Sequence, residues 1–131
     1  MSGTLDDVIK YRIHRAWDTF DDAKILAENQ KWNSSINRLY YAAFYAIIAL
    51  LLNEGVKTTT HNGVKTAFSE HFIKKGAISK EYGKIYSQLF IWRQKGDYDD
   101  LFDFNNEKVL PYFVPVKELI QLIENKINNN L

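Results

Sequence analysis

The 131-residue sequence has no cysteine and only three histidines. Without cysteine there can be no disulfide framework, no cysteine-ligated metal and no thiol nucleophile, and such a composition fits a reducing cytoplasm. The histidines, His14, His61 and His71, are not paired at helical spacing, and no Glu-x-x-His, His-Glu-x-x-His or glycine-rich phosphate loop occurs. Sites for a bridged metal pair, zinc or a nucleotide cofactor need such patterns. We therefore expect no metal and no cofactor.

The sequence also lacks an apolar run long enough for a membrane span. The longest run extends from Leu39 to Leu52, which is shorter than the about 20 residues that a bilayer requires. The N-terminal residues MSGTLDDVIK do not show the basic and then apolar pattern of a signal peptide. We expect a soluble, cytoplasmic protein that does not interact with a membrane.

The residues that are present have ordinary globular proportions, with 46% hydrophobic and 25% charged. This length and composition predict one domain over residues 1–131. Aromatic residues make up 15% of the chain, and large amphipathic rings suit both helix packing and subunit interfaces. Formation of a homodimer is therefore one expectation.

Apolar residues recur at helical spacing in five segments, and no segment alternates with the period of a strand. The second segment is apolar on nearly every face, which predicts that it is the central helix. Short connections make consecutive helices antiparallel neighbours. The fold class is therefore predicted to be all-α, an antiparallel up-and-down bundle of about five helices. The expected helices run from Leu5 to Gln30, from a cap at Asn33 or Ser34 to Gly55, from His61 to Gly76, from a Ser79 cap to Gly96, and from about Val109 to Ile127.

Two details of these helices are sharper predictions. Gly83, inside the fourth helix, indicates close packing by a neighbour. Pro111 and Pro115 interrupt the fifth helical pattern, so that helix should be kinked or start late. Residues 97–105 are expected to form an acidic loop.

Charge is distributed unevenly along the chain. Residues 57–95 contain eight Lys or Arg against two Glu, a net charge of +6, and residues 96–110 contain five acids against one Lys, a net charge of −4. One interpretation is a phosphate-binding face beside an acidic loop. The alternative, and the more common case for such runs, is a set of solvated helix faces without a ligand.

The most distinctive polar cluster is Arg93-Gln-Lys-Gly-Asp97-Tyr98. It places a guanidinium, a carboxylate and a phenol within about one turn, at the expected end of the fourth helix. Arg93, Asp97 and Tyr98 are therefore the candidate catalytic residues. The alternative is that Arg93 is a helix C-terminal cation that answers the macrodipole and pairs with Asp97.

Two further residues are weaker candidates for binding a nucleotide or RNA. Arg38 opens the most apolar helix, so it should be partly buried and needs an acceptor, which Asp97 or Asp18 could supply. His61 follows three threonines at the start of the third helix. Both residues also have a purely structural interpretation, in the core for Arg38 and in the capping region for His61.

These residues together resemble a known family. The chain resembles the HEPN-domain family of bacteria and archaea in the motifs that it carries and in their order. These are Asn37-Arg38-Leu-Tyr40-Tyr41-Ala-Ala-Phe-Tyr45, then His61-Asn-Gly63-Val, then Phe68, Phe72 and Gly76, and finally Arg93-Gln-Lys-Gly-Asp97-Tyr98. The likeness covers nearly the whole chain. It implies a helical bundle that dimerises, and that is often encoded beside a small nucleotidyltransferase, with many members acting as toxins or on RNA.

The resemblance also implies a possible chemistry. Catalytic members cleave RNA without metal through an Arg followed four to six residues later by His. Arg93 matches the arginine, but positions 97–99 read Asp-Tyr-Asp. A phenol of pKa about 10 or a carboxylate of about 4 is poorly tuned as a general base at neutral pH, so we expect cleavage far slower than that of a histidine-bearing relative, unless His61 or Tyr98 substitutes.

The function expected from the sequence is therefore a HEPN-like dimer that binds RNA or nucleotide at Arg93, Asp97 and Tyr98. It would be the toxin-type component of a pair with a nucleotidyltransferase. The alternative is a non-catalytic helical module for dimerisation or protein interaction, in which Arg93 and Asp97 only fasten the end of a helix.

Overall fold

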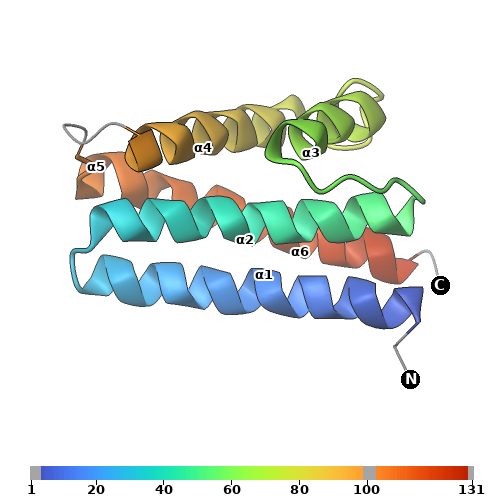
Figure 1. Ribbon diagram of the computed structural model, residues 1–131, viewed down its shortest axis with the longest axis horizontal. Coiled ribbons are helices and arrows are strands. Elements are labelled where there is room, and N and C mark those ends of the chain that lie inside the picture. The colour runs from blue at the N-terminus through green and yellow to red at the C-terminus, as the bar shows by residue number, and fades with distance from the viewer. Residues whose placement is uncertain (1–3, 99–102, 130–131) are drawn as a thin grey trace.

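A computed structural model describes residues 4–98 and 103–129 of the chain, with the side chains of residues 4–95 and 103–129. Its described part is helical, without strands, which confirms the all-α bundle (Figure 1). The elements are α1 (Leu5–Glu28), α2 (Trp32–Asn53), α3 (His61–Phe68), a π-helical turn (Ser69–Ile73), α4 (Lys80–Tyr98), α5 (Asn106–Val109), a 3₁₀ turn (Leu110–Tyr112) and α6 (Phe113–Asn129).

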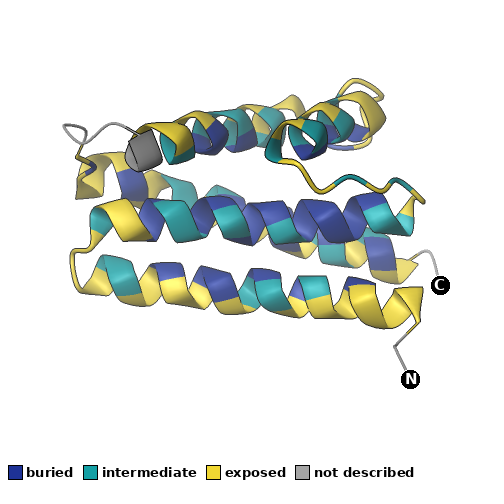
Figure 2. Ribbon diagram, in the orientation of Figure 1, coloured by how far each residue is buried: buried dark blue, intermediate teal, exposed yellow. Residues whose placement is uncertain are grey.

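The helix α2 lies at the centre of the bundle, as its all-round apolar pattern predicts. It runs antiparallel beside α1, with α6 and the α3–α4 layer on its other sides (Figure 1). Most of its length is buried, whereas α1 exposes its outer face (Figure 2). By length and composition α2 could cross a membrane, but 72% of its most apolar stretch of 18 residues is buried inside the bundle. Such burial is also what the core helix of a soluble protein shows.

Side-chain hydrogen bonds stabilise the start of α1 and the contact between α1 and α2. Thr4 and Asp7 form a reciprocal capping box at the start of α1, which satisfies two backbone N–H groups that a helix start leaves unpaired. The buried Ser35 hydroxyl donates to the Ala23 carbonyl oxygen at 2.8 Å. That bond holds the start of α2 against the end of α1.

The prediction that Asn33 or Ser34 caps the second helix is wrong. The helix starts earlier, with Lys31 in the N-cap position and no side-chain cap bond. Asn33 instead accepts from the Phe104 backbone N–H at 2.8 Å and donates to the Asp103 carboxylate at 3.3 Å. It therefore ties the chain that leads into α5 to the first turn of α2, a long-range role that local sequence does not reveal.

The third predicted helix is present but changes its geometry midway. Thr60 caps α3 by accepting from the Gly63 N–H, and after Phe68 the helix widens into the π-helical turn. Gly76 follows with a φ of 77°, a left-handed conformation that glycine adopts without penalty.

A β-carbon at Gly83, in the fourth helix, would lie 3.3 Å from Ile73, which confirms the close packing predicted there.

The fourth helix extends further than predicted. It continues past Gly96 to Tyr98, so Gly96 does not stop it, and Asp97 and Tyr98 belong to the helix rather than to an acidic loop. Of the rest of that predicted loop, residues 99–102 lie outside the described residues, and residues 103–105 are neither helix nor strand. An isolated glycine weakens a helix by only about 1 kcal/mol relative to alanine, which neighbouring turns can offset. The predicted interruption is confirmed at Pro111, where α5, the 3₁₀ turn and then α6 replace one continuous helix. Pro115 does not interrupt α6, because it lies in the first turn of that helix, where proline is tolerated.

Candidate functional site

Arg93 lies on α4 and reaches the middle of α2. Its side chain is half-buried, and its Nε donates to the Tyr41 hydroxyl oxygen at 3.2 Å. The guanidinium carbon also lies 5.8 Å from the ring centroids of both Tyr40 and Tyr41. A guanidinium over aromatic faces is attracted by the ring quadrupoles. The charge of Arg93 is thus held in one place by two neighbouring tyrosines.

Arg38 approaches the same tyrosine from within α2. Its guanidinium carbon lies 4.9 Å from the Tyr41 ring centroid. Its Nε and an Nη donate to the Asn37 side-chain oxygen at 3.2 and 2.8 Å. The prediction that Arg38 is partly buried is confirmed, but the acceptor found is the neutral Asn37 amide and not Asp18. The side chain of Asp97, the other predicted acceptor, lies outside the described residues.

The two arginines line one open pocket of about 450 Å³ between α4 and the ends of α1 and α2. Its walls combine two guanidinium groups with small polar side chains and one indole. Arginine presents a planar fork of donors that suits phosphate oxygens. The lining residues are Leu26, Asn33, Ser34, Ile36, Asn37, Arg38, Trp92 and Arg93.

His61 lies against the other side of the same aromatic cluster. Its ring centroid is 4.8 Å from that of Phe44 and 5.7 Å from those of Tyr40 and Tyr41. The structure therefore brings His61 and Arg93 to the same pair of tyrosines, from α3 and α4.

A chain of hydrogen bonds links the imidazole to two buried phenols. The Tyr86 hydroxyl donates to the Tyr40 hydroxyl oxygen at 3.3 Å, and the Tyr40 hydroxyl lies 2.9 Å from Nδ1 of His61. Burial raises the pKa of Tyr40 above its ordinary value and that of Tyr86 well above it, so both phenols keep their protons at neutral pH. The Tyr40 hydroxyl and Nδ1 of His61 therefore share one hydrogen bond, whose donor depends on the tautomer of the imidazole.

The remaining predicted site residues are only partly placed. Asp97 and Tyr98 follow Arg93 in the last turn of α4, but their side chains lie outside the described residues. The interpretation of Arg93 as a last-turn cation is not supported, because α4 continues five residues beyond it and the basic residue of its last turn is Lys95.

Sequence reasoning missed the residues that organise this site. Tyr40, Tyr41 and Asn37 stand in the segment that carries the family resemblance, yet their contacts with Arg38, Arg93 and His61 were not predicted. The spacing of Arg38 and Tyr41, three residues apart on one helix, is a signal that could have indicated their contact. Tyr86 carries no such signal, because its pattern is that of an ordinary core position.

Within residues 4–95 and 103–129, no three His, Asp or Glu side chains are placed to hold a metal ion.

Comparison with known proteins places the chain in a family. The HEPN domain model matches residues 9–126. A UPF0332 protein of Thermotoga maritima is 39% identical over 124 residues, which cover 95% of this chain and 94% of that protein. A Methanocaldococcus jannaschii protein named "Putative toxin MJ0605" is 36% identical over 90 residues, which cover 69% of this chain and 67% of that protein. Since the family match covers most of the sequence and the helical fold agrees with it, the chain belongs to the HEPN domain family.

Proposed function

We propose that the protein binds RNA or a nucleotide through phosphate contacts in the pocket of Arg38 and Arg93. The observation that carries this proposal is that two arginines from different helices converge on the ring of Tyr41 and line one open pocket. Two like charges held close together raise the local positive potential, and an anion that enters the pocket relieves their repulsion.

The partners of the two arginines described above support binding of an anion. Arg38 donates to the Asn37 amide and Arg93 donates to the Tyr41 phenol, and these two acceptors are neutral groups that themselves cancel no positive charge. Charge-assisted hydrogen bonds from arginine to phosphate are about twice as strong as neutral ones. Asn37 and Tyr41 orient the guanidinium groups before a ligand arrives, which lowers the entropy lost on binding.

His61 contributes to the same proposal through its place beside the tyrosines that hold Arg93. Its Nδ1 lies 2.9 Å from the Tyr40 hydroxyl, so this ring nitrogen is engaged by a phenol rather than by a ribose 2′-hydroxyl. We therefore infer that the protein binds RNA more readily than it cleaves it, and that it acts in the cell as a toxin-type component that needs a controlling partner.

The homodimer belongs to this proposal as well. Leu5, Val8 and Tyr11 are 53%, 40% and 57% exposed along one side of α1, and exposed apolar residues grouped in this way favour a protein interface. Light scattering at micromolar concentration tests the dimer, with a mass near twice the 15.3 kDa of one chain expected. A mass near 15.3 kDa would exclude a site shared by two subunits.

The name of the toxin-like relative supports a toxin–antitoxin arrangement, for which we propose a nucleotidyltransferase-type partner. Co-purification of the protein with the product of a neighbouring nucleotidyltransferase gene tests the partner. Absence of a complex between the two purified proteins would contradict it.

The binding proposal is tested by fluorescence anisotropy with a labelled single-stranded RNA and, separately, with a labelled adenine nucleotide. Loss of a charge-assisted hydrogen bond weakens binding by about tenfold or more, and we expect this for Arg93→Ala and for Arg38→Ala. Arg15→Ala is the matched control, because Arg15 packs over the Tyr45 ring at 5.2 Å, as Arg38 does over Tyr41, but does not line the pocket.

The alternative function, a non-catalytic interaction module, predicts a different outcome. In that case the wild-type protein would bind neither probe, and Arg93→Ala would lower the melting temperature by many degrees because Arg93 would only fasten α4 to α2. The half-buried position of Arg93 is compatible with some loss of stability in either case, so the binding measurement decides between them.

A further inference from the structure

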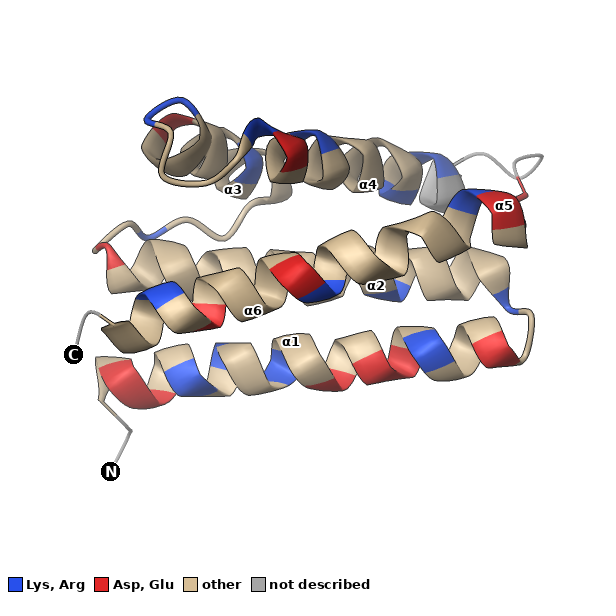
Figure 3. Cartoon of the chain, turned by 180° about the vertical axis from the view of Figure 1, so that it is seen from behind, with Lys and Arg blue, Asp and Glu red and all other residues tan. Residues whose placement is uncertain are grey.

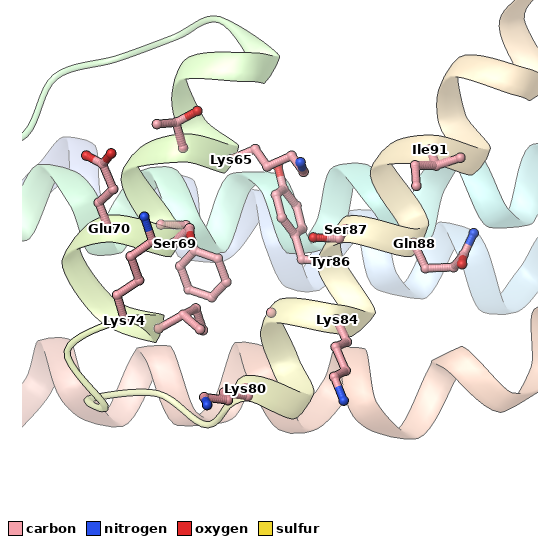
Figure 4. Close-up of a pocket in the computed structure, with 14 residues that line it drawn as sticks. Lys65, Ser69, Glu70, Lys74, Lys80, Lys84, Tyr86, Ser87, Gln88 and Ile91 are labelled. Atoms are coloured by element: carbon pink, nitrogen blue, oxygen red, sulfur yellow. The ribbon is translucent and has the colours of Figure 1, made fainter.

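A second depression lies away from the arginine pocket, between α4 and the wall made by α3 and the π-helical turn. It has a volume of about 720 Å³, and none of its lining residues belongs to the arginine pocket. Four lysines surround it (Figure 4). Lys65 lies on α3, Lys74 directly follows the π-helical turn, and Lys80 and Lys84 lie on α4. We call this depression the lysine groove.

The charge of the lysine groove is strongly one-sided. Its four lysines face a single acid, Glu70, which gives a net charge of +3. Basic segments lie along α3 and α4 in the view from behind, with acidic segments among them (Figure 3). Such a cluster attracts a ligand with several negative charges. Lysine is a flexible point charge without the planar fork of arginine, so the groove suits separate carboxylates or phosphates rather than one bidentate group.

The floor of the groove indicates whether its anionic ligand is a nucleic acid or a protein segment. Phe68 and Tyr86 lie beneath it but are only 2% and 1% exposed, so neither offers a ring face to solvent. The accessible apolar surface is aliphatic, with Ile91 46% exposed at one end. Proteins that hold single-stranded nucleic acid stack bases on exposed aromatic rings. An aliphatic floor instead accepts aliphatic side chains.

The backbone keeps this floor smooth. Gly83 lines the groove, and a β-carbon there would meet Ile73 at 3.3 Å. The absence of a side chain lets Ile73 of the π-helical turn pack directly on α4.

Between Lys80 and Ile91 the groove follows about 16 Å of α4, from a rise of about 1.5 Å per residue. This length matches about three turns of a helix laid alongside.

We propose that the lysine groove binds an acidic amphipathic helix of a partner protein, with aliphatic side chains on the floor and carboxylates at the four lysines. This is a helix-in-groove arrangement in which burial of the aliphatic face gives affinity and the charges give orientation and rate. The site is separate from the proposed phosphate-binding pocket, so either can exist without the other.

The test uses fluorescence anisotropy with the full chain and three labelled probes. The first is a helical peptide of about three turns with leucines on one face and glutamates on its flanks. The second has the same charge but glutamine in place of leucine, and the third is a single-stranded RNA. The variants are Lys74→Glu combined with Lys84→Glu, which reverses one charge on each wall, and Ile91→Ser. Lys24→Glu, on the exposed face of α1, is the matched control.

We expect the leucine peptide to bind with micromolar affinity and the glutamine peptide at least about tenfold more weakly. The double charge reversal should weaken the leucine peptide by about tenfold or more and Ile91→Ser by several-fold, with Lys24→Glu within about twofold of wild type. Equal binding of both peptides would overturn the proposal, and so would no binding of the leucine peptide below millimolar concentration. Loss of RNA affinity in the double charge reversal, with no peptide bound, would assign the groove to nucleic acid instead.

Discussion

The Nε of Arg93 donates to the hydroxyl oxygen of Tyr41 at 3.2 Å, across a separation of 52 residues. The same Tyr41 ring lies beneath the guanidinium of Arg38. One tyrosine on the central helix therefore positions both arginines that line the pocket, one by its hydroxyl and one by its ring. In the proposed function Tyr41 is a positioning residue, because it acts on a phosphate through the arginines.

Replacing Tyr41 with phenylalanine separates these two effects. The ring remains beneath both guanidinium groups, but the Nε of Arg93 loses the Tyr41 hydroxyl as an acceptor, so we expect RNA affinity to fall by about two- to fivefold and the free energy of unfolding by about 1 kcal/mol. Anisotropy and thermal melting measure the two changes. Tyr45→Phe, one turn further along α2, is the control. An RNA affinity equal to wild type would show that Tyr41 does not position Arg93 for binding.

Local periodicity was sufficient to predict most of the fold. The apolar pattern identified α2 as the central helix, and Pro111 identified the break before α6. The start of α2 was predicted wrongly because a tertiary contact engages the expected cap residue, and the end of α4 because one glycine was too weak a signal to stop the helix. Asn33 bonds to Phe104 rather than capping its own helix, and α4 continues through Gly96.

The site was predictable only in part, because tertiary contacts assemble it. Arg93, Arg38 and His61 stood out because charged or titratable residues beside apolar runs are unusual. Their meeting point was hidden, since Tyr40, Tyr41 and Tyr86 look like ordinary aromatic core positions in the sequence. Pairings between α2 and α4, or between α2 and α3, depend on how the helices pack, which a single sequence does not specify.

Asn33→Ala tests the tie between the first turn of α2 and the chain before α5. The substitution leaves the Phe104 N–H without its acceptor in a part-buried position, and an unsatisfied buried donor costs about 1–3 kcal/mol. We expect the free energy of unfolding in urea to fall by about that amount, with faster hydrogen exchange at Phe104. Asn125→Ala, on the exposed face of α6, should change neither quantity. An unchanged midpoint in Asn33→Ala would mean that this contact does not hold the segment.

The buried tyrosines predict a specific loss of stability at alkaline pH. Because burial raises the pKa of Tyr40 and of Tyr86 above the ordinary 10.0, the unfolded chain releases phenolic protons at a lower pH than the folded chain. The unfolded chain then binds fewer protons, so the free energy of unfolding is unaffected by these groups below about pH 10 and falls as the pH rises further.

Thermal melts between about pH 9 and pH 11 should therefore show a smaller decline for Tyr86→Phe than for wild type. The variant should also lose about 1 kcal/mol at neutral pH, where its donor to Tyr40 is missing. Tyr82→Phe, at a side chain that is only partly buried, is the control and should follow wild type. Parallel declines of wild type and Tyr86→Phe would contradict the assignment of the effect to the buried pair.

RNA cleavage in the presence of a chelator tests the chemistry. Arg93 can stabilise charge on a phosphorane, but it cannot act as the base, and typical general-base catalysis supplies about 10² to 10⁴-fold. We expect slow cleavage by wild type and a marked increase for Tyr98→His, which places a histidine five residues after Arg93. His61→Ala and Tyr98→Phe are run beside them. The contrary outcome is rapid RNA cleavage by wild type, with the activity lost in Arg93→Ala but kept in both His61→Ala and Tyr98→Phe. That outcome would show that another residue is the general base.

The salt dependence of RNA binding tests the central claim most directly, because it counts phosphate contacts. For single-stranded nucleic acid the slope of log K against log salt concentration is about −0.7 for each contact. We expect its magnitude to fall by about 0.7 in Arg38→Ala, by the same amount in Arg93→Ala, and by about 1.4 in the double variant, while Arg15→Ala keeps the wild-type slope. Slopes that remain at the wild-type value in all three pocket variants would show that Arg38 and Arg93 do not contact phosphate.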